Sequence, residues 1–234
     1  MTATLTQADL GALRRFDTPT ICNAIELVAP ARRVIGFTSK PFVCLDVSLP
    51  PMVGYARTAT IRALEQPRLP ADKVREKRLA YYDYVAAGPL PSIVVIQDLD
   101  EQPGFGAFWG EVHTTVHKSL GALGAITNGS FRDIDASAPG FQILGGMVNP
   151  SHAYVHCVDF GGSVHVHGMT VASGDLIHAD RHGAVVIPHD IAQALPAAAE
   201  LLARREKVIL DACRAPGFNV EKLKAAIIGS AEIH

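Results

Sequence analysis

Hydrophobic and polar residues change their spacing several times along this chain, and each change predicts a new element. Residues 55–62 alternate as in a half-buried strand, and residues 93–96 form a β-branched run that is typical of a buried strand. Residues 71–87, which lie between them, have the spacing of a helix. We expect four of its side chains to point inward: Val74, Leu79, Tyr82 and Val85.

A helix signal stands near the start of the chain. Thr18 and Pro19 have the residue types of an N-cap and a first helical residue, and Ile21 and Ile25 belong to the apolar face that follows. Residues 30–52 are rich in proline and glycine, so we expect loops with short strands there.

The second half of the chain continues with alternating elements. We expect a helix at 111–122, a strand at 124–128, and further strands starting near Ile143 and Val155 and covering 164–171 and 176–187. Helices alternate with strands only in the middle of the chain, and strands predominate after residue 140. This order predicts the α/β class, with a single domain over residues 1–234 and a mixed central sheet.

The last part of the chain has helical spacing again. Residues 190–214 begin a C-terminal helical extension, which we expect to run from about 190 to 234. Val208 and Ile209 should be buried. The exposed side should carry three charged residues: Glu200, Arg204 and Glu206.

Composition excludes several functional classes. The hydrophobic content of 48% and the charged content of 19% are those of a globular protein, and a net charge of -2 leaves no electrostatic footprint for nucleic acid. No apolar run approaches the roughly 20 residues of a membrane span, and the N-terminus lacks the pattern of a signal peptide. We therefore expect a cytoplasmic protein with no membrane partner. Four cysteines without CxxC spacing argue for reduced thiols and against a zinc site: Cys22, Cys44, Cys157 and Cys213.

The most informative interval runs from Glu111 to Arg132, which lie 21 positions apart. A glycine-rich run, 104–111, leads from a strand into a helix, where backbone amides can hold an anion. Arg132 offers a planar fork for a carboxylate or enolate, and Asp133 is a hard oxygen ligand suited to Mg²⁺ or Mn²⁺. These groups can meet at one edge of a sheet and bind a metal ion with an anionic substrate.

Each part of this pattern is also compatible with a different role. The glycines, which include Gly106 and Gly110, can serve a tight turn alone. The run is also a loose variant of a dinucleotide-binding fingerprint, but the next strand ends without the acid that would bind a ribose. The pair of Arg132 and Asp133 can be a surface ion pair, with Asp133 or Asp135 capping the turn that follows.

The histidines offer a further possibility. His165 and His167 lie two apart in an expected strand and would share a face, with His152 and His156 nearby in sequence. No diagnostic spacing supports a transition-metal cluster.

Histidines and acids elsewhere have simpler roles. His113 and His117 are one helical turn apart, and a packed or solvated position is the simpler interpretation for both, although His113 could touch substrate. Asp175 and Asp180 fall in expected turns, where aspartate bonds to the local backbone.

Four stretches together resemble the RraA-like family, which includes class II 4-hydroxy-4-methyl-2-oxoglutarate/4-carboxy-4-hydroxy-2-oxoadipate aldolases. They are residues 53–60, 109–111, 121–133 and 174–188, and their order fits across about residues 17–190. The resemblance implies a swivelling domain of the β/β/α type, with a mixed central sheet flanked by helices in α/β/α layers. It also implies homotrimers or homohexamers with active sites between subunits.

The resemblance assigns roles to individual residues. Asp133 should bind Mg²⁺ or Mn²⁺, and Arg132 should contact the keto or enolate oxygen of a pyruvate-like group. Glu111 should bond water on the metal or take part in proton transfer. A neighbouring subunit's C-terminal helix should add an acid, for which Glu206 is the candidate. Backbone amides should hold the substrate carboxylate, and those residues are Gly110, Glu111, Val112 and His113.

The chain departs from the family pattern at three places. Glu111 stands where aspartate is usual, His113 stands where an aliphatic residue is common, and residues 62–92 do not follow the usual sequence. These departures leave the substrate open.

The resemblance implies a metal-dependent lyase that cleaves 4-hydroxy-2-oxo acids to pyruvate by a retro-aldol reaction, with oxaloacetate decarboxylase activity. The alternative is a non-catalytic regulatory protein of the ribonuclease E inhibitor type, which would not need an acid at position 111. A nicotinamide-dependent oxidoreductase and a methyltransferase both lack support, since no nucleoside-binding loop is apparent. No lysine falls in an expected desolvated strand, so a Schiff base is not indicated.

Overall fold

The computed structural model describes residues 5–233. The helices are α1 (Gln7–Leu13), α2 (Thr18–Val28), α3 (Ala71–Ala86), α4 (Glu111–Ser119), α5 (Leu195–Arg214) and α6 (Val220–Ala231), with 3₁₀ turns η1 (Pro30–Arg32), η2 (Ile134–Ala136) and η3 (Ala192–Ala194). The strands are β1 (Val43–Cys44), β2 (Met52–Arg62), β3 (Ser92–Asp98), β4 (Ala107–Trp109), β5 (Ala122–Thr127), β6 (Ser130–Phe131), β7 (Gln142–Gly145), β8 (Met147–Val148), β9 (His156–Phe160), β10 (Val164–Val166), β11 (Met169–Val171), β12 (Leu176–Asp180) and β13 (Gly183–Ile187).

The long strand β2 organises the main sheet. Strands follow the order β1-β7-β5-β3-β2-β12-β13, and β9 pairs with the second half of β2. The four strands β2, β3, β5 and β7 run parallel, whereas β1, β9, β12 and β13 pair antiparallel with their neighbours. The prediction of an α/β fold with a mixed central sheet is confirmed. The parallel strands end at one common edge, which places the loops after β2, β3 and β5 close together.

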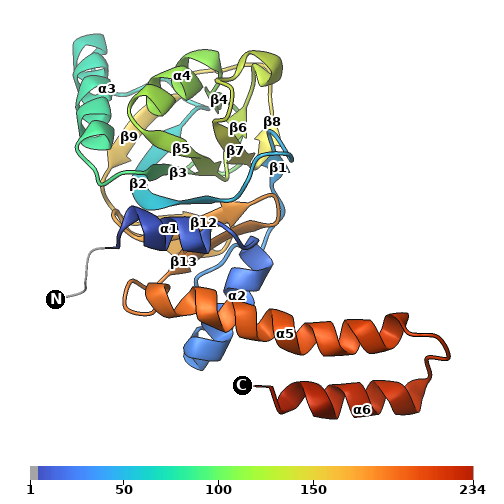
Figure 1. Cartoon of the computed structure of the whole chain (residues 1–234). Helices are drawn as coiled ribbons and strands as arrows, with labels where there is room; N and C mark the ends of the chain where they lie inside the picture. Colours follow the sequence, from blue (N-terminus) through green and yellow to red (C-terminus); the bar gives the residue numbers. More distant parts are fainter. Residues whose placement is uncertain (1–4, 234) are drawn as a thin grey trace.

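Helices cover the sheet on two sides. Figure 1 shows α3 and α4 above the sheet, and α1, α2 and α5 on the side of β12 and β13. One buried cluster joins α3 and β4 to the parallel strands, on which α4 also packs through β5, and a second joins α1, α2 and α5 to β12 and β13. The hairpin of β10 and β11 contributes to a third cluster on the sheet. Helices therefore pack on both faces of the sheet.

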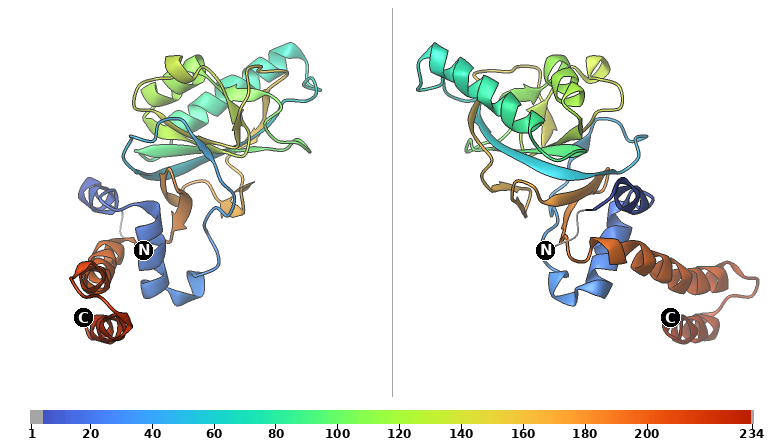
Figure 2. Two further views of the ribbon diagram at one scale, coloured as in Figure 1. Left: turned by 90° about the vertical axis from the view of Figure 1, so that its right-hand side faces the viewer. Right: turned by 60° about the vertical axis from the view of Figure 1, so that its left-hand side comes forward.

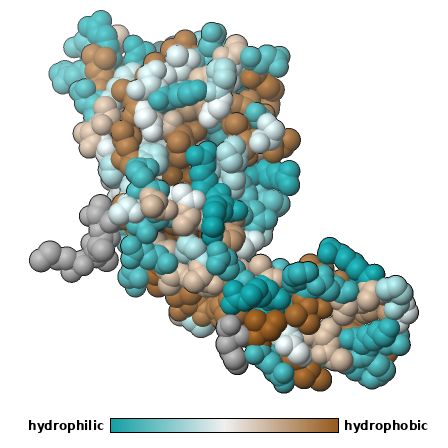
Figure 3. Space-filling view, in the orientation of Figure 1, coloured by the Kyte–Doolittle hydropathy of each residue, from teal (hydrophilic) through white to brown (hydrophobic). Residues whose placement is uncertain are grey.

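The C-terminal helices form an arm. Arg205 in α5 donates a hydrogen bond from Nε to the carbonyl oxygen of Ile233 (3.0 Å), which ties the end of the chain back to α5. Figure 2 shows the arm extending away from the sheet. Val208 and Ile209 are only half-buried, contrary to the expectation, because the outer part of α5 packs on α6 alone. Figure 3 shows apolar side chains on the arm, and its exposed large ones are Leu210, Phe218, Val220, Ile227 and Ile228.

Two helix boundaries differ from the expectation. The N-cap of α2 is Asp17, whose Oδ1 accepts a hydrogen bond from the backbone N–H of Thr20 (2.9 Å), so Thr18 is already helical. Helix α4 ends at Ser119 and not at 122, because Gly121 has a φ of 91° and the next residues enter β5. The glycine-rich run also contains a strand, β4, that pairs with β6.

The inward face of α3 differs as well. Leu79 is 56% exposed, whereas Tyr81 is buried, and Val74 and Tyr82 are half-buried. Tyr81 is drawn inward by a polar partner: its hydroxyl donates a hydrogen bond to Nε2 of His117 in α4 (2.8 Å). Apolar periodicity could not predict this contact between two helices.

Within residues 5–233, there is no helix that combines the length and the apolar character needed to cross a bilayer.

We predict that the protein loses stability as the pH falls from about 6.5 to about 4. Burial lowers the pKa of His178 to about 4, whereas an unfolded histidine titrates near 6.5. The folded state keeps the ring neutral, with Thr18 donating to Nδ1 (3.0 Å) and Nε2 donating to the carbonyl oxygen of Phe16 (3.1 Å). Below pH 6.5 the unfolded state binds a proton that the folded state does not, so acid favours unfolding.

At pH 5 this single group should lower the free energy of unfolding by about 2 kcal/mol relative to pH 7.5. Urea unfolding at the two pH values measures the difference. His178→Gln should reduce the pH dependence. An undiminished pH dependence in His178→Gln would contradict the assignment.

Candidate functional site

The N-terminus of α4 meets the loop after β6. Gly110 is the N-cap of α4 and has no side chain to satisfy the first-turn amides. The carboxylate of Asp133 supplies the acceptor from the other loop: its Oδ2 accepts a hydrogen bond from the backbone N–H of Glu111 (3.2 Å). Arg132 donates its backbone N–H to the carbonyl oxygen of Trp109 (2.9 Å), which holds the two segments together. The structure thus brings Gly110, Glu111, Arg132 and Asp133 to one place.

Asp133 has a left-handed backbone conformation, with φ 54° and ψ 47°. A residue other than glycine pays a conformational cost there, and aspartate is among those that tolerate it best. Two hydrogen bonds to the carbonyl oxygen of Asp133 hold the turn, one from the backbone N–H of Ala136 (3.1 Å) and one from the Ser137 hydroxyl (2.9 Å). Strained backbone that is fixed by its surroundings is frequent at functional sites.

Position 110 requires glycine because there is no room for a side chain, and not because of its backbone angles. Its φ of -167° is extended backbone that any residue adopts. A β-carbon at this position would lie 2.5 Å from Oδ2 of Asp133 and 3.3 Å from Cγ of Arg132. The glycine therefore allows the carboxylate to approach the helix N-terminus.

The site combines opposite charges near solvent. The Nε of Arg132 lies 3.6 Å from Oδ2 of Asp133, and their side chains are 36% and 38% exposed. The alternative interpretation of Arg132 and Asp133 from the sequence was a surface ion pair, with Asp133 or Asp135 capping the turn that follows. The ion pair exists, but the carboxylate caps α4, and no side chain caps η2. A carboxylate, a guanidinium and the positive end of a helix dipole can together bind a cation and an anion side by side.

The other residues of the first turn differ in exposure. The side chains of Glu111 and Val112 point to solvent. The ring of His113 packs instead against Phe108, with ring centroids 4.2 Å apart. Burial, followed by the charges of His117, Arg78 and Arg132, lowers the pKa of His113 to about 3. His113 is therefore neutral at ordinary pH, and its ring is used in packing.

A buried hydrogen-bond chain beneath α4 was not predicted from the sequence. His117 donates from Nδ1 to the carbonyl oxygen of His113 (2.7 Å), so its Nε2 accepts the hydrogen bond from Tyr81. The available signal was the group of three tyrosines within 81–84 together with two histidines one helical turn apart. This chain fixes α4 on α3.

Glu206 is not near this site within one chain. It is an exposed residue of α5, which lies across the main sheet from α4 (Figure 1). Its predicted role requires a second subunit.

The histidines in the second half of the chain do not gather. His165 is exposed in β10, whereas His167 lies in the turn before β11 with a φ of 48° and stacks on Phe42. The expectation that both share a strand face is wrong, because the strand turns back at His167-Gly168. His152 and His156 each use Nδ1 to donate to a nearby backbone carbonyl oxygen. Across residues 5–233, no three His, Cys, Asp or Glu side chains form a ready metal cluster.

Asp175 and Asp180 bond to the local backbone, as expected. Oδ2 of Asp175 accepts from the N–H of Ala172 (2.8 Å). Asp180 accepts from the N–H groups of His182 (2.8 Å) and of Thr18 (2.9 Å), and the second bond fixes α2 on β12.

Comparison with known proteins identifies relatives by sequence pattern and by fold. A family model described as RraA-like, Aldolase/RraA, matches residues 18–186. A search of curated proteins found no match.

Solved structures with the same fold have low sequence identity. An uncharacterized protein from Pseudomonas syringae pv. tomato has a TM-score of 0.71 at 19% identity, covering 96% of both chains. RraAS2 of Streptomyces coelicolor, described as an unusual member of the RNase ES inhibitor RraA family, has a TM-score of 0.69 at 21% identity, covering 88% of this chain and 96% of that one. A structure described as one of novel cellulases from microbes of the gut ecosystem has a TM-score of 0.72 at 17% identity, covering 88% of this chain and 89% of that one. At these identities the likeness establishes the fold alone.

We predict that Asp133→Ala lowers the free energy of unfolding by about 1–2 kcal/mol, because α4 loses its cap and alanine is less tolerant of the left-handed backbone. Asp133→Asn should lose less, since asparagine keeps an acceptor and tolerates this conformation. Urea unfolding of both variants measures the difference. Equal losses in the two variants would contradict this explanation.

Proposed function

The chain belongs to the RraA-like family, and on that premise we propose that it is a divalent-metal-dependent lyase. Its reaction is the retro-aldol cleavage of 4-hydroxy-2-oxo acids to pyruvate, with decarboxylation of oxaloacetate as a related activity. One observation carries the proposal: the Asp133 carboxylate, the Arg132 guanidinium and the first-turn amides of α4 converge within hydrogen-bond and ion-pair distance.

The donor set fits Mg²⁺ or Mn²⁺. Asp133 provides hard carboxylate oxygen, and only its Oδ2 is engaged by the amide of Glu111. The absence of a β-carbon at position 110 lets this carboxylate lie against the N-terminus of α4. Asp133 would hold the ion with solvent completing its coordination, as Mg²⁺ usually retains several waters. A bound divalent ion supplies positive charge that polarises the keto oxygen of the substrate.

The substrate carboxylate fits the helix N-terminus. The N–H groups of Val112 and His113 belong to the first turn of α4 and have no intrahelical acceptor. The helix dipole adds to their attraction for an anion. Because a 2-oxo acid carries its keto group next to its carboxylate, binding there directs the keto oxygen toward Arg132.

Cleavage breaks the bond between C3 and C4 of the substrate. A base removes the proton of the 4-hydroxyl, that oxygen forms a carbonyl, and the electron pair of the broken bond moves into the enolate of pyruvate. Arg132 holds a fixed positive charge beside the oxygen on which negative charge develops. Losing such a donor typically raises the barrier by about 3–4 kcal/mol. Protonation of C3 then gives pyruvate. Oxaloacetate loses CO₂ from the same position and passes through the same enolate.

Two acids can move the protons. The carboxylate of Glu111 lies at the first position of α4, is exposed, and follows Gly110 directly. Glu206 from a neighbouring subunit is the second candidate in our proposal. The exposed apolar side chains of the α5–α6 arm support association into a homotrimer or homohexamer, in which the arm of one subunit approaches α4 of the next.

The alternative function is a non-catalytic regulatory protein of the ribonuclease E inhibitor type. The fold is compatible with it, since RraAS2 is described as a member of that inhibitor family. The acid at position 111, next to the Asp133 carboxylate that its backbone N–H contacts, favours the enzyme, because an inhibitor would not need an acid there.

We predict magnesium-dependent release of pyruvate from oxaloacetate, which EDTA abolishes. Asp133→Asn should reduce kcat/KM at least about a hundredfold, since the ion loses its protein ligand while the fold is kept. A coupled lactate dehydrogenase assay measures pyruvate, with enzyme-free Mg²⁺ solutions subtracted. Arg33→Gln, an exposed change far in sequence from the site, is the control and should keep full activity. The protein could also fail to turn over oxaloacetate and several 4-hydroxy-2-oxo acids with either Mg²⁺ or Mn²⁺. That result would contradict the proposed lyase activity and favour the regulatory binding role.

We further predict that Asp133→Asn and Glu206→Gln subunits complement each other. Each pure variant should be nearly inactive, whereas co-expressed mixtures should recover turnover, because some interfaces then combine an intact Asp133 with an intact Glu206. Size-exclusion chromatography confirms that the mixed oligomer forms. A fully active Glu206→Gln variant would remove this residue from the mechanism.

A further inference from the structure

A cavity of about 580 Å³ lies at the carboxyl end of β2, apart from the groups discussed above. Its walls come from the segment after β2, the first half of α3, the loop after β3 and the start of β9. Ligands of open α/β sheets bind outside the carboxyl ends of parallel strands, and this volume is typical of small-molecule sites.

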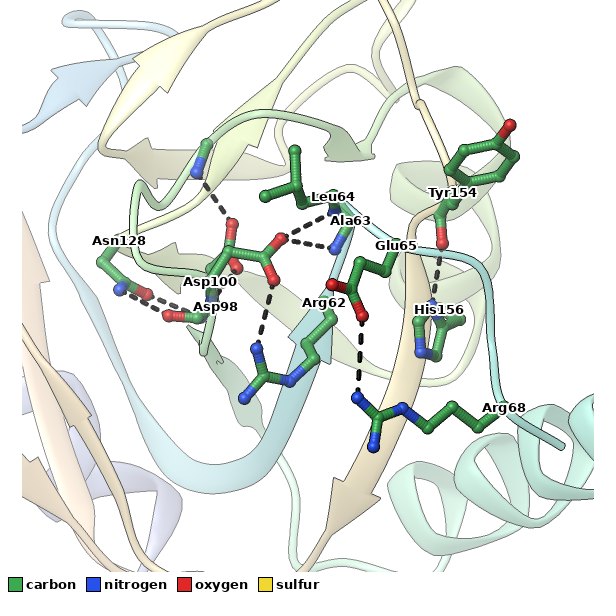
Figure 4. Close-up of polar contacts among 11 residues, drawn as sticks. Arg62, Ala63, Leu64, Glu65, Arg68, Asp98, Asp100, Asn128, Tyr154 and His156 are labelled. Atoms are coloured by element: carbon green, nitrogen blue, oxygen red, sulfur yellow. Dashed lines mark hydrogen bonds and ion pairs between the residues drawn. The ribbon is translucent and has the colours of Figure 1, made fainter.

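Hydrogen bonds within the protein hold the inner wall of the cavity in place. The side chain of Asp100 is only 4% exposed, and its Oδ2 accepts hydrogen bonds from the N–H groups of Ala63 (2.7 Å) and Leu64 (2.8 Å). Asp98 in turn accepts from the N–H of Asp100 (3.0 Å), and its backbone N–H donates to Oδ1 of Asn128 (2.7 Å). Figure 4 shows this network next to Arg62. The buried carboxylate of Asp100 thus fixes the backbone that forms this wall.

Arg62 presents an unused edge to the cavity. Its Nη1 lies 3.4 Å from Oδ1 of Asp100. Its Nε and Nη2 make no hydrogen bond to any residue that the structure describes, although the neighbouring Asp100 keeps the guanidinium in place. Those two N–H groups form the planar fork that binds a carboxylate through two parallel hydrogen bonds.

The remaining polar groups favour a ligand with a single negative charge. Lys77 is tethered to β9, since one of its three Nζ donors is used by the carbonyl oxygen of Val158 (2.6 Å). Arg68 is paired loosely with Glu65 at 3.8 Å (Figure 4). Glu65 and Glu101 both line the cavity and would repel an anion of higher charge.

One side of the cavity is apolar. Leu64, Pro67, Leu69 and Val74 line it, and Leu64 and Leu69 are each about half exposed. Burial raises the pKa of the Cys157 thiol to about 11, so this side chain is a neutral part of the wall and not a nucleophile. An apolar ligand body would cover the two exposed leucines.

We propose that this cavity binds a small organic monocarboxylate with an apolar body. The carboxylate is held by the free edge of Arg62, and the body covers Leu64 and Leu69. Most of the lining comes from residues 62–77, within the segment that departs from the family pattern, so the site is a feature of this chain. Binding requires neither the metal ion nor the keto acid of the proposed reaction.

The test uses octanoate as the probe in isothermal titration calorimetry on the full-length protein. Octanoate should bind with a Kd between about 10 µM and 1 mM. Acetate, which lacks the body, and 1-octanol, which lacks the charge, should each bind at least about tenfold more weakly.

Two variants separate the contributions of charge and surface. Arg62→Gln removes the fork, and Leu69→Glu places a negative charge on the exposed apolar wall without disturbing the core. Each should weaken octanoate binding at least about tenfold, whereas Arg33→Gln should bind like the wild type. Circular dichroism shows whether each variant is folded. If Arg62→Gln is unfolded, octanoate binding by Leu69→Glu is the test of the proposal. Binding of octanoate no tighter than that of acetate, or equal binding by wild type and Leu69→Glu, would overturn the proposal.

Discussion

The contact between the Asp133 carboxylate and the N-terminus of α4 is the constraint on which the site depends. It requires a left-handed residue in one loop and a residue without a β-carbon in the other, since a side chain at position 110 would collide with Oδ2. The same contact caps α4 and places Arg132 beside the first-turn amides. Asp133 therefore has a structural role as the cap of α4 and a chemical role in the proposed site, and both use the same carboxylate. Only a variant that keeps one of the two roles can distinguish them.

The parallel strands explain why chemistry gathers at one edge of the sheet. Loops that follow β2, β3 and β5 all emerge there, so segments distant in sequence become neighbours. Asp98 links two of these loops, because it bonds to Asn128 through its backbone and to Gly104 through its carboxylate (2.7 Å). The proposed reaction site and the proposed carboxylate cavity are built on neighbouring loops of this edge, although different residues line them.

Burial decides which ionisable groups remain available for function. His113, His117 and His178 all have a lowered pKa because they are desolvated, so they are neutral in the folded protein and serve packing. Tyr81 is buried beside His117 and bonds to it. Arg132 and Asp133 are more than one-third exposed and keep access to ligands. An exposed pair supported by a buried neutral cluster is a stable basis for binding charged molecules.

Local patterns in the chain were enough to predict the α/β class, the mixed sheet and most elements, because hydrophobic period and turn residues are local properties. They also placed Arg132, Asp133 and Glu111 together, since a strand and a helix of known length separate them. Long-range contacts determined the rest: Tyr81 and not Leu79 is buried, His167 leaves the strand, and Arg62 has a free edge. Those outcomes depend on side-chain partners from distant segments, and a single sequence does not reveal which segments become neighbours.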